Sequence, residues 1–245
     1  ATGSLEDEVL RRVEERLTYL RSLVKRQEEI LTRIEEQGKL NEELRTAIEA
    51  AEKLQTLEDI YRPYKQKKRT RASVARERGL APLADAILLQ HETTGSAEEY
   101  AAAFVNPAAD VPSPADALAG ARDILAEQIM DEAEVRRTLR DVYRRTALLE
   151  TSLDRTAEGA DTFAMYDGYR EPARTLPSHR ILAINRGEKK GCLTVHINID
   201  HEENIAWISR RIHRRPSIFT EELRAAIEDG YKRLLVPALE RELRA

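Results

Sequence analysis

The chain has 245 residues, of which 41% are hydrophobic, 34% are charged and 5% are aromatic. This length fits one large domain or two small ones at about 150 residues per domain. The scarcity of aromatic residues argues against an all-β sandwich or barrel. The 40 basic and 44 acidic side chains give a net charge of −4. Whole-chain charge therefore does not indicate a nucleic-acid partner, and such a prediction must rest on a local patch.

Cys192 is the only cysteine, which excludes an intrachain disulfide and a CxxC zinc site and fits a reducing compartment. No apolar run approaches the roughly 18 residues of a membrane helix, and residues 1–30 do not have the pattern of a signal peptide. The sequence starts at Ala1 without an initiator methionine, so we expect the ends of a processed or partial chain.

The strongest periodic pattern follows Ser4, the expected N-cap, and predicts one helix about 50 Å long that stops at Gly38. Apolar residues alternate at spacings of four and three, interrupted by Gln27, at Val13, Leu17, Leu20, Val24, Leu31 and Ile34. The apolar stripe is wider than the seam of a two-stranded coiled coil. We therefore favour a helix of a larger bundle, with a free dimeric coiled coil as the alternative.

Caps and turn residues predict several shorter helices after this one. Helices are expected at 42–53 after the N-cap Asn41, at 57–61, at 70–78 and at 81–89, and a further one at 97–104 lies inside a linker at 91–114. Two more begin at Pro114 and at Asp131, and the second of these includes Leu148 and Leu149. The last two are 202–213 and 220–243, with a break at Pro237. Residues 193–199 alternate apolar and polar side chains and are the best strand candidate. Its partner could be 161–167, the turn before Cys192, or a part of a larger protein.

The predicted fold class is therefore mainly α, an elongated multi-helix bundle with a helix-turn-helix-like part and one short β element near 193–199. Changes in composition suggest five segments. They are a long helical scaffold in 1–62, a basic loop and helix-turn-helix-like segment with linker in 63–110, a continuation of the bundle in 111–158, a mixed segment in 159–200, and C-terminal helices in 201–245.

The basic stretch at 61–78 is the most informative one for function. It holds eight Lys or Arg residues and one acid, Glu77, in a chain that is acidic overall. Such a cluster can bind phosphates through counterion release without reading base sequence. The candidate nucleic-acid-binding residues are Tyr64, Lys65, Lys67, Lys68, Arg69, Arg71, Arg76 and Arg78. The alternative is a solvated basic loop whose charges pair with the chain's own carboxylates.

Residues 74–80 fit a helix-turn-helix, because Ala75 is small enough for two helices to approach and Gly79 suits the turn. Asp85 stands where an apolar residue is usual, so a generic αα-hairpin stays open. Two further basic sets are possible surfaces, and the second also suits a helix C-terminus. They are Arg136, Arg137, Arg140, Arg144 and Arg145, and Arg210, Arg211, His213, Arg214 and Arg215.

Catalytic motifs are missing from the sequence, and we expect no enzyme, no cofactor and no metal. The glycines at 185–191 lack the GK[ST] ending of a phosphate loop, so this stretch is best explained as a polar turn. His196, Asp200 and His201 could approach a metal, but His196 and His201 would face opposite sides of a strand. Cys192 has no activating partner and is most simply a small buried side chain.

Several runs, in order along nearly the whole chain, resemble the bacterial Tex proteins. They are VEERLTYL at 13–20, IEEQGKL at 34–40, LEDIYRPYK at 57–65, RTRA at 69–72, ARERGLAPLA at 75–84, PSHRILAINRGE at 177–188 and YKRLLVPALEREL at 231–243. The resemblance implies a cytoplasmic transcription accessory protein that binds RNA or DNA. It also implies that the family's first helices precede Ala1, and that RNase H-like, helix-hairpin-helix and OB-fold parts follow Ala245.

The function that we expect is a nucleic-acid-binding scaffold that contacts the RNA or DNA backbone largely independently of sequence. The alternative is a protein–protein scaffold for RNA polymerase, the transcription machinery or the family's C-terminal domains, with no nucleic-acid contact in this part. No catalytic residue can be carried over from the resemblance, because the family's RNase H-like part lies beyond Ala245.

Overall fold

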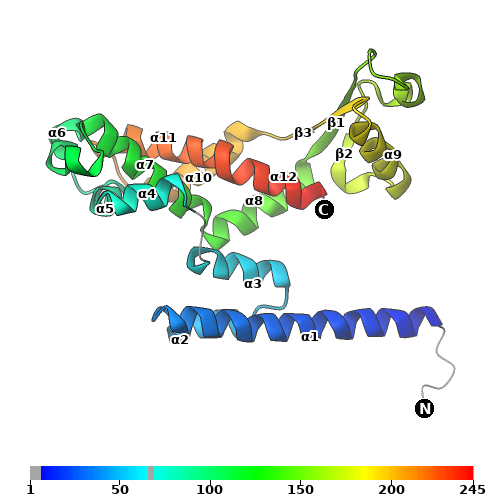
Figure 1. Cartoon of the computed structure of the whole chain (residues 1–245), viewed down its shortest axis with the longest axis horizontal. Coiled ribbons are helices and arrows are strands. Elements are labelled where there is room, and N and C mark those ends of the chain that lie inside the picture. The colour runs from blue at the N-terminus through cyan, green and yellow to red at the C-terminus, as the bar shows by residue number, and fades with distance from the viewer. Residues whose placement is uncertain (1–6, 66–68, 245) are drawn as a thin grey trace. The chain divides into compact units, whose positions relative to one another are not determined.

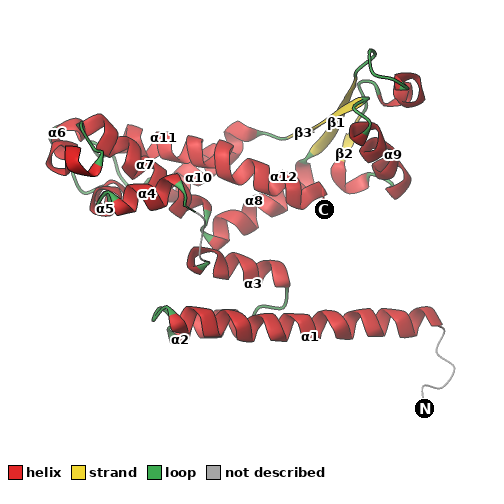
Figure 2. Ribbon diagram, viewed as in Figure 1, coloured by secondary structure: helices red, strands yellow, loops and turns green. Residues whose placement is uncertain are grey.

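The computed structural model describes residues 7–65 and 69–244, and these residues are mainly helical (Figures 1 and 2). Ser4, the expected N-cap of the first helix, lies outside the described residues. Contacts divide the chain into two compact units. One comprises residues 1–68 with 131–133, and the other comprises 69–130 with 134–245.

The first unit consists of three helices, α1 (Asp7–Glu36), α2 (Glu42–Glu49) and α3 (Leu54–Tyr61). As predicted, α1 ends before Gly38, whose φ is +65°, and the Lys39 N–H bonds back to the Ile34 carbonyl at 3.2 Å. The Asn41 side chain caps α2 by accepting from the Leu44 N–H at 2.7 Å. The predicted helix at 42–53 therefore begins as expected and ends four residues early.

The core of the first unit uses the C-terminal part of the predicted apolar stripe of α1, with Leu23 and Ile30 beside it. Its buried members are Leu23, Ile30, Ile34, Ile48, Ala51, Leu57 and Tyr61. Val13, Leu17, Leu20 and Val24 stay exposed, with 40–57% of their surface accessible. The expectation that neighbouring helices would cover this stripe is wrong for its N-terminal half within the described residues. The reason is that the α2–α3 core packs mainly against the C-terminal half of α1.

The second unit contains the remaining helices. They are α4 (Arg71–Glu77), α5 (Ala81–Leu89), α6 (Ala97–Ala101), α7 (Pro114–Met130), α8 (Ala133–Thr146), α9 (Ser178–Lys189), α10 (His201–Ile212), α11 (Thr220–Gly230) and α12 (Val236–Arg244). Short 3₁₀ turns lie at Arg62–Tyr64 in the first unit and at Ala102–Phe104, Pro107–Ala109, Ala160–Tyr166 and Ala173–Thr175 in the second. The predicted N-cap Ser113 accepts from the Asp116 N–H at 3.2 Å.

Helix α7 is the centre of the second unit, since α4, α5, α6 and α11 all pack against it (Figure 1). Small residues permit the closest approach. A Cβ at Gly230 of α11 would lie 3.0 Å from the Ala126 carbonyl oxygen and 3.1 Å from the Ala126 Cα of α7. The two backbones are therefore in close contact, and a side chain at position 230 would require α7 to shift by a few tenths of an ångström.

The predicted break at Pro237 takes the form of a wider helical turn. Residues Tyr231–Leu235 form a π-helical turn between α11 and α12, in which the Val236 N–H bonds to the Tyr231 carbonyl. Proline has no N–H and its ring clashes with the carbonyl four residues earlier, so a regular α-helix cannot run through it unchanged. The π turn supplies the adjustment and lets the chain continue as a helix.

A three-stranded antiparallel sheet, in the order β2-β1-β3, accompanies these helices (Figure 2). It consists of β1 (Leu148–Leu153), β2 (Arg170–Pro172) and β3 (Leu193–Asn198). The predicted strand near 193–199 is confirmed as β3, but its partner is β1 and none of the partners that the sequence suggested. Leu148 and Leu149 were wrongly assigned to the preceding helix, which ends at Thr146. Leu149 instead packs with Phe163 and Ile184 under the sheet.

We expect Gly230→Ala to lower the free energy of unfolding by about 1–3 kcal/mol, because the added methyl group must separate α7 from α11. Helix propensity alone would give the opposite sign, since alanine is favoured over glycine by about 1 kcal/mol. The control is Ala225→Gly at an exposed position of α11, which measures the effect of helix propensity alone in this helix. Urea unfolding monitored by circular dichroism gives both values, and a stabilised Gly230→Ala protein would contradict the close approach.

Candidate nucleic-acid interface

The predicted basic site is divided between the two units. Tyr64 and Lys65 belong to the first unit, whereas Arg69, Arg71, Arg76 and Arg78 belong to the second. Lys67 and Lys68 lie outside the described residues. The structure therefore describes how the four arginines are arranged, and nucleic-acid binding by all eight residues stays a prediction.

In the first unit, the two tyrosines beside the basic stretch are engaged in contacts within the protein. Tyr61 is 2% exposed, and the Arg26 guanidinium carbon lies 5.5 Å from the centre of its ring. Tyr64 is half-buried, and its carbonyl accepts a hydrogen bond from the Gln37 side chain at 2.8 Å. Tyr61 therefore cannot stack on a base, whereas Lys65 is exposed and free to approach a phosphate.

In the second unit, a capping box fixes the start of α4. The Thr70 hydroxyl accepts from the Ser73 N–H at 3.0 Å, and the Ser73 hydroxyl accepts from the Thr70 N–H at 2.8 Å. Gly79, with φ of +82°, turns the chain into α5. Ala75 is buried as predicted, but Asp85 is exposed. The helix pair thus has the turn that the sequence predicted, and sequence-specific DNA reading stays an untested prediction.

An open groove of about 500 Å³ lies between α4 with its preceding residues and α7. Arg69, Arg71 and Arg78 line it together with Asp116 and Asp123. The structure thus brings three of the predicted arginines to one surface. Arg76 is not in this lining, and its Nη1 lies 3.0 Å from Glu127.

Most of these arginines are already close to a carboxylate of the chain. Arg69 lies 3.6 Å from Glu77, and Arg78 forms an ion pair with Asp110. Burial raises the pKa of Asp123, although the nearby Arg233 and Arg71 act in the opposite direction. Sequence reasoning missed Asp110 and Glu127, since residues 32 and 51 positions away in the chain leave no local signal.

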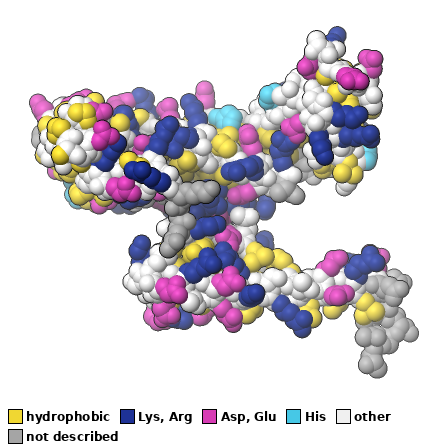
Figure 3. All heavy atoms as spheres, in the orientation of Figure 1, with side chains coloured by type: hydrophobic (Ala, Val, Ile, Leu, Met, Phe, Trp, Pro, Cys, Tyr) yellow, Lys and Arg dark blue, Asp and Glu magenta, His cyan; other side chains and the backbone are white. Residues whose placement is uncertain are grey.

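The internal ion pairs compensate positive charge of the groove, but Arg69 and its partner Glu77 are mostly exposed. Exposed ion pairs contribute only about 0–1 kcal/mol each, so a phosphate can compete for the same guanidinium groups. Lys and Arg side chains are interspersed with Asp and Glu over the face of the molecule in Figure 3. The groove differs from this mixed surface because the side chains of three arginines and two aspartates line one hollow.

The first of the two further basic sets is not a continuous surface. Arg136 is 2% exposed and Arg140 is 7% exposed. Both bind the Glu242 carboxylate of α12, Arg140 through Nε at 2.7 Å and Arg136 through Nη2 at 3.2 Å. The prediction of an exposed basic face is therefore wrong for these two residues, which instead hold α12 against α8. In the second set, Arg210 pairs with Glu203 at 2.7 Å and Arg211 with Glu134 at 2.6 Å.

The described residues provide neither the cluster of ligands that a metal site requires nor a helix that could span a membrane. Within 7–65 and 69–244, no group of three or more His, Cys, Asp and Glu side chains could hold a metal ion. The Nδ1 atom of His201 instead lies 3.0 Å from the Tyr231 hydroxyl. Cys192 is buried as a free thiol. No helix in this part of the chain is long and apolar enough to cross a membrane.

Comparison with known proteins identifies the family. Residues 92–235 match the family described as Tex central region-like. "Protein tex" of Bordetella pertussis is 46% identical over 202 residues, which are 82% of this chain and 25% of that protein. "Uncharacterized protein YdcI" of Bacillus subtilis is 38% identical over 249 residues, 99% of this chain and 34% of that protein.

A more distant relative is "S1 RNA-binding domain-containing protein 1" of Homo sapiens, which is 30% identical over 259 residues, 99% of this chain and 26% of that protein. The chain spans about a quarter to a third of the length of these curated relatives. The family match covers more than half of its residues, and the chain belongs to the Tex family.

We expect Glu242→Gln to lower the free energy of unfolding by about 1–3 kcal/mol, because two nearly buried guanidinium groups lose the carboxylate that both of them contact. The control is Glu221→Gln, which removes an ion pair with Arg224 that is 59–71% exposed and should change stability little. Urea unfolding at neutral pH compares the two variants. Equal effects would contradict the role of Glu242 in holding α12.

The same carboxylate predicts a dependence of stability on pH. Burial raises the pKa of Glu242, but Arg140 and Arg136 outweigh it, and the net pKa lies below the ordinary 4.5. The stability from Glu242 is therefore complete above about pH 5 and is lost as the pH falls through the depressed value. Between about pH 5 and 3 the urea midpoint of the unsubstituted chain should fall more steeply than that of Glu242→Gln.

Proposed function

We propose that this part of a Tex-family protein binds the phosphate backbone of RNA or DNA largely independently of sequence, without a catalytic role. The observation that carries the proposal is the groove beside α4, where Arg69, Arg71 and Arg78 meet on one open surface. Guanidinium groups form bidentate hydrogen bonds with phosphate oxygens, which suits them to contact a nucleic-acid backbone. Lys65, in the first unit, is also exposed and offers a separate positive charge.

The relatives supply supporting context for this proposal. One is named for an S1 RNA-binding domain and another is called "Transcriptional accessory protein Tex". Their names describe proteins about three to four times longer than this chain. We infer a role in transcription in the cytoplasm, in keeping with the free buried thiol of Cys192.

A protein–protein scaffold is the second candidate, and one observation favours it. Arg69 and Arg78 of the groove already contact carboxylates, so the same surface suits an acidic protein such as a component of the transcription machinery. Under this alternative, the arginines of the groove would release the chain's own carboxylates and bind carboxylates of RNA polymerase or of another part of the same protein.

Binding of the chain to single- and double-stranded RNA and DNA, measured at several salt concentrations, tests the first proposal. The double variant Arg69→Gln/Arg71→Gln should bind more weakly, and each lost phosphate contact should reduce the slope of log K against log salt by about 0.9 on duplex DNA. The matched control is Arg210→Gln/Arg224→Gln, which removes two exposed guanidinium groups elsewhere. Equal slopes for the two double variants would overturn the assignment to the groove.

Charge reversal separates the two candidates. We expect Lys67→Glu/Lys68→Glu/Arg69→Glu to abolish RNA binding while pull-down of RNA polymerase by the same chain is unchanged. Loss of polymerase pull-down with intact RNA binding would favour the protein–protein scaffold instead.

A further inference from the structure

The two edges of the small sheet differ in how they are protected. Strand β2 has three residues and ends at Pro172, features that natural proteins use to prevent pairing with another chain. Strand β3, at the other edge, has six residues in unbroken register with β1, from Leu193 opposite Leu153 to Asn198 opposite Leu148. It contains no proline, lysine, glycine or bulge. Its outer edge therefore lacks the usual protection.

The hydrogen bonds of β1 show which backbone groups of β3 face outward. The Thr151 N–H bonds to the Tyr169 carbonyl on the β2 side at 3.0 Å, and the Asp154 N–H bonds to the Cys192 carbonyl on the β3 side at 2.9 Å. In an antiparallel pair, every second residue exchanges its backbone hydrogen bonds with the residue opposite it. Counting from Cys192, the residues of β3 that bond to β1 are therefore Thr194, His196 and Asn198.

The backbone groups of Val195 and Ile197 consequently point away from β1. Among the described residues, no hydrogen bond satisfies these four groups. Both residues are only half-buried, so the unpaired N–H and C=O groups lie at an accessible edge. An added strand would pair with them without disturbing any existing bond of the sheet.

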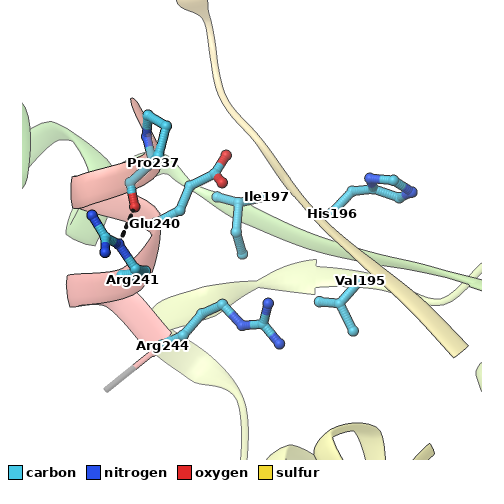
Figure 4. A pocket seen from close by; sticks show the side chains of 7 residues that line it. All are labelled: Val195, His196, Ile197, Pro237, Glu240, Arg241 and Arg244. Atoms are coloured by element: carbon cyan, nitrogen blue, oxygen red, sulfur yellow. Dashed lines mark hydrogen bonds between the residues drawn. The ribbon is translucent and has the colours of Figure 1, made fainter. Parts of the chain in front are cut away.

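A groove of about 340 Å³ lies beside this strand, between β3 and α12 (Figure 4). The side chains of Val195 and Ile197 point toward α12, whereas His196 points to the opposite side of the strand. Arg241 lines the α12 wall, is exposed, and has as its only hydrogen bond among the described residues the 2.9 Å contact from its Nε to the Pro237 carbonyl. Glu240 and Arg244 line the same wall, and Arg244 is already paired with Glu188.

We propose that β3 accepts an extended peptide segment of a partner protein as a fourth strand. The segment would pair its backbone with Val195 and Ile197, place apolar side chains over these two residues, and direct an acidic side chain to Arg241. Alternating backbone bonds give such a site its affinity, and the side-chain contacts give it selectivity. This surface involves neither α4 nor the arginine groove, so it is independent of the proposed nucleic-acid contact.

The test uses the whole chain and a short capped peptide in which valine and threonine alternate and one terminal valine is replaced by glutamate. Amide hydrogen exchange should be fast at Val195 and Ile197 in the free chain and slow at His196. Saturating peptide should slow exchange at Val195 and Ile197. The same peptide with methyl groups on alternate backbone nitrogens should have no effect, because it cannot form the ladder.

Two variants assign the contacts. Val195→Pro removes one outward N–H and leaves the bonds to β1, so peptide affinity should fall by about tenfold or more, while Val195→Ala should lose less. Protection of the His196 amide in the proline variant verifies that the sheet is intact. Arg241→Gln should weaken the glutamate peptide and leave unchanged a peptide with glutamine in its place.

Three results would overturn the proposal. The first is unchanged exchange at Val195 and Ile197 with saturating peptide. The second is protection that rises with the concentration of the chain alone, which would show that a second copy pairs with this edge. The third is protection by RNA or DNA and not by the peptide, which would assign the edge to nucleic acid.

Discussion

The close packing of helices around α7 is the constraint on which the rest of the second unit depends. Glycine at 230 lets α11 touch the backbone of α7, and Gly120 leaves room for Leu80, whose Cδ1 would lie 2.3 Å from a Cβ at that position. The second contact also positions the turn between α4 and α5. Because α4 is held against α7 in this way, Arg71 and the flanking Arg69 and Arg78 line one wall of a groove.

Arginine–carboxylate contacts have two different roles in this chain. At Glu242 they are largely shielded from water and hold α12 against α8. At Arg69 and Glu77 both partners are mostly exposed, so water screens the interaction and the partners can exchange. The same pair of chemical groups is thus structural in one place and available for binding in another, and burial decides which.

Sequence reasoning succeeded where the cause of a structure is local. Asn41 and Ser113 act as caps, Gly38 and Gly79 end helices, and the alternation at 193–198 forms a strand, because each signal lies within a few residues. It failed where the cause is distant. Leu148 and Leu149 continue a helical spacing, and only pairing with β3 shows that they belong to a strand. The burial of Arg136 likewise depends on Glu242, which lies 106 residues away.

The candidate site was predictable in composition and not in arrangement. A run of basic residues at 61–78 is visible in the sequence, but which of them share a surface depends on α7, and which are paired depends on Asp110 and Glu127. The free edge of β3 had no sequence signal of its own, since it follows from the order of the strands in the sheet.

The π-helical turn before Pro237 determines which way the last helix faces. One extra residue in a turn rotates everything after it by about 100° relative to a regular α-helix. Without that rotation Glu242 would be directed away from α8, and the contacts of Arg136 and Arg140 with its carboxylate would be lost. Deleting a single residue from 231–235 would therefore reorient the end of the chain, even though every remaining side chain would be chemically unchanged.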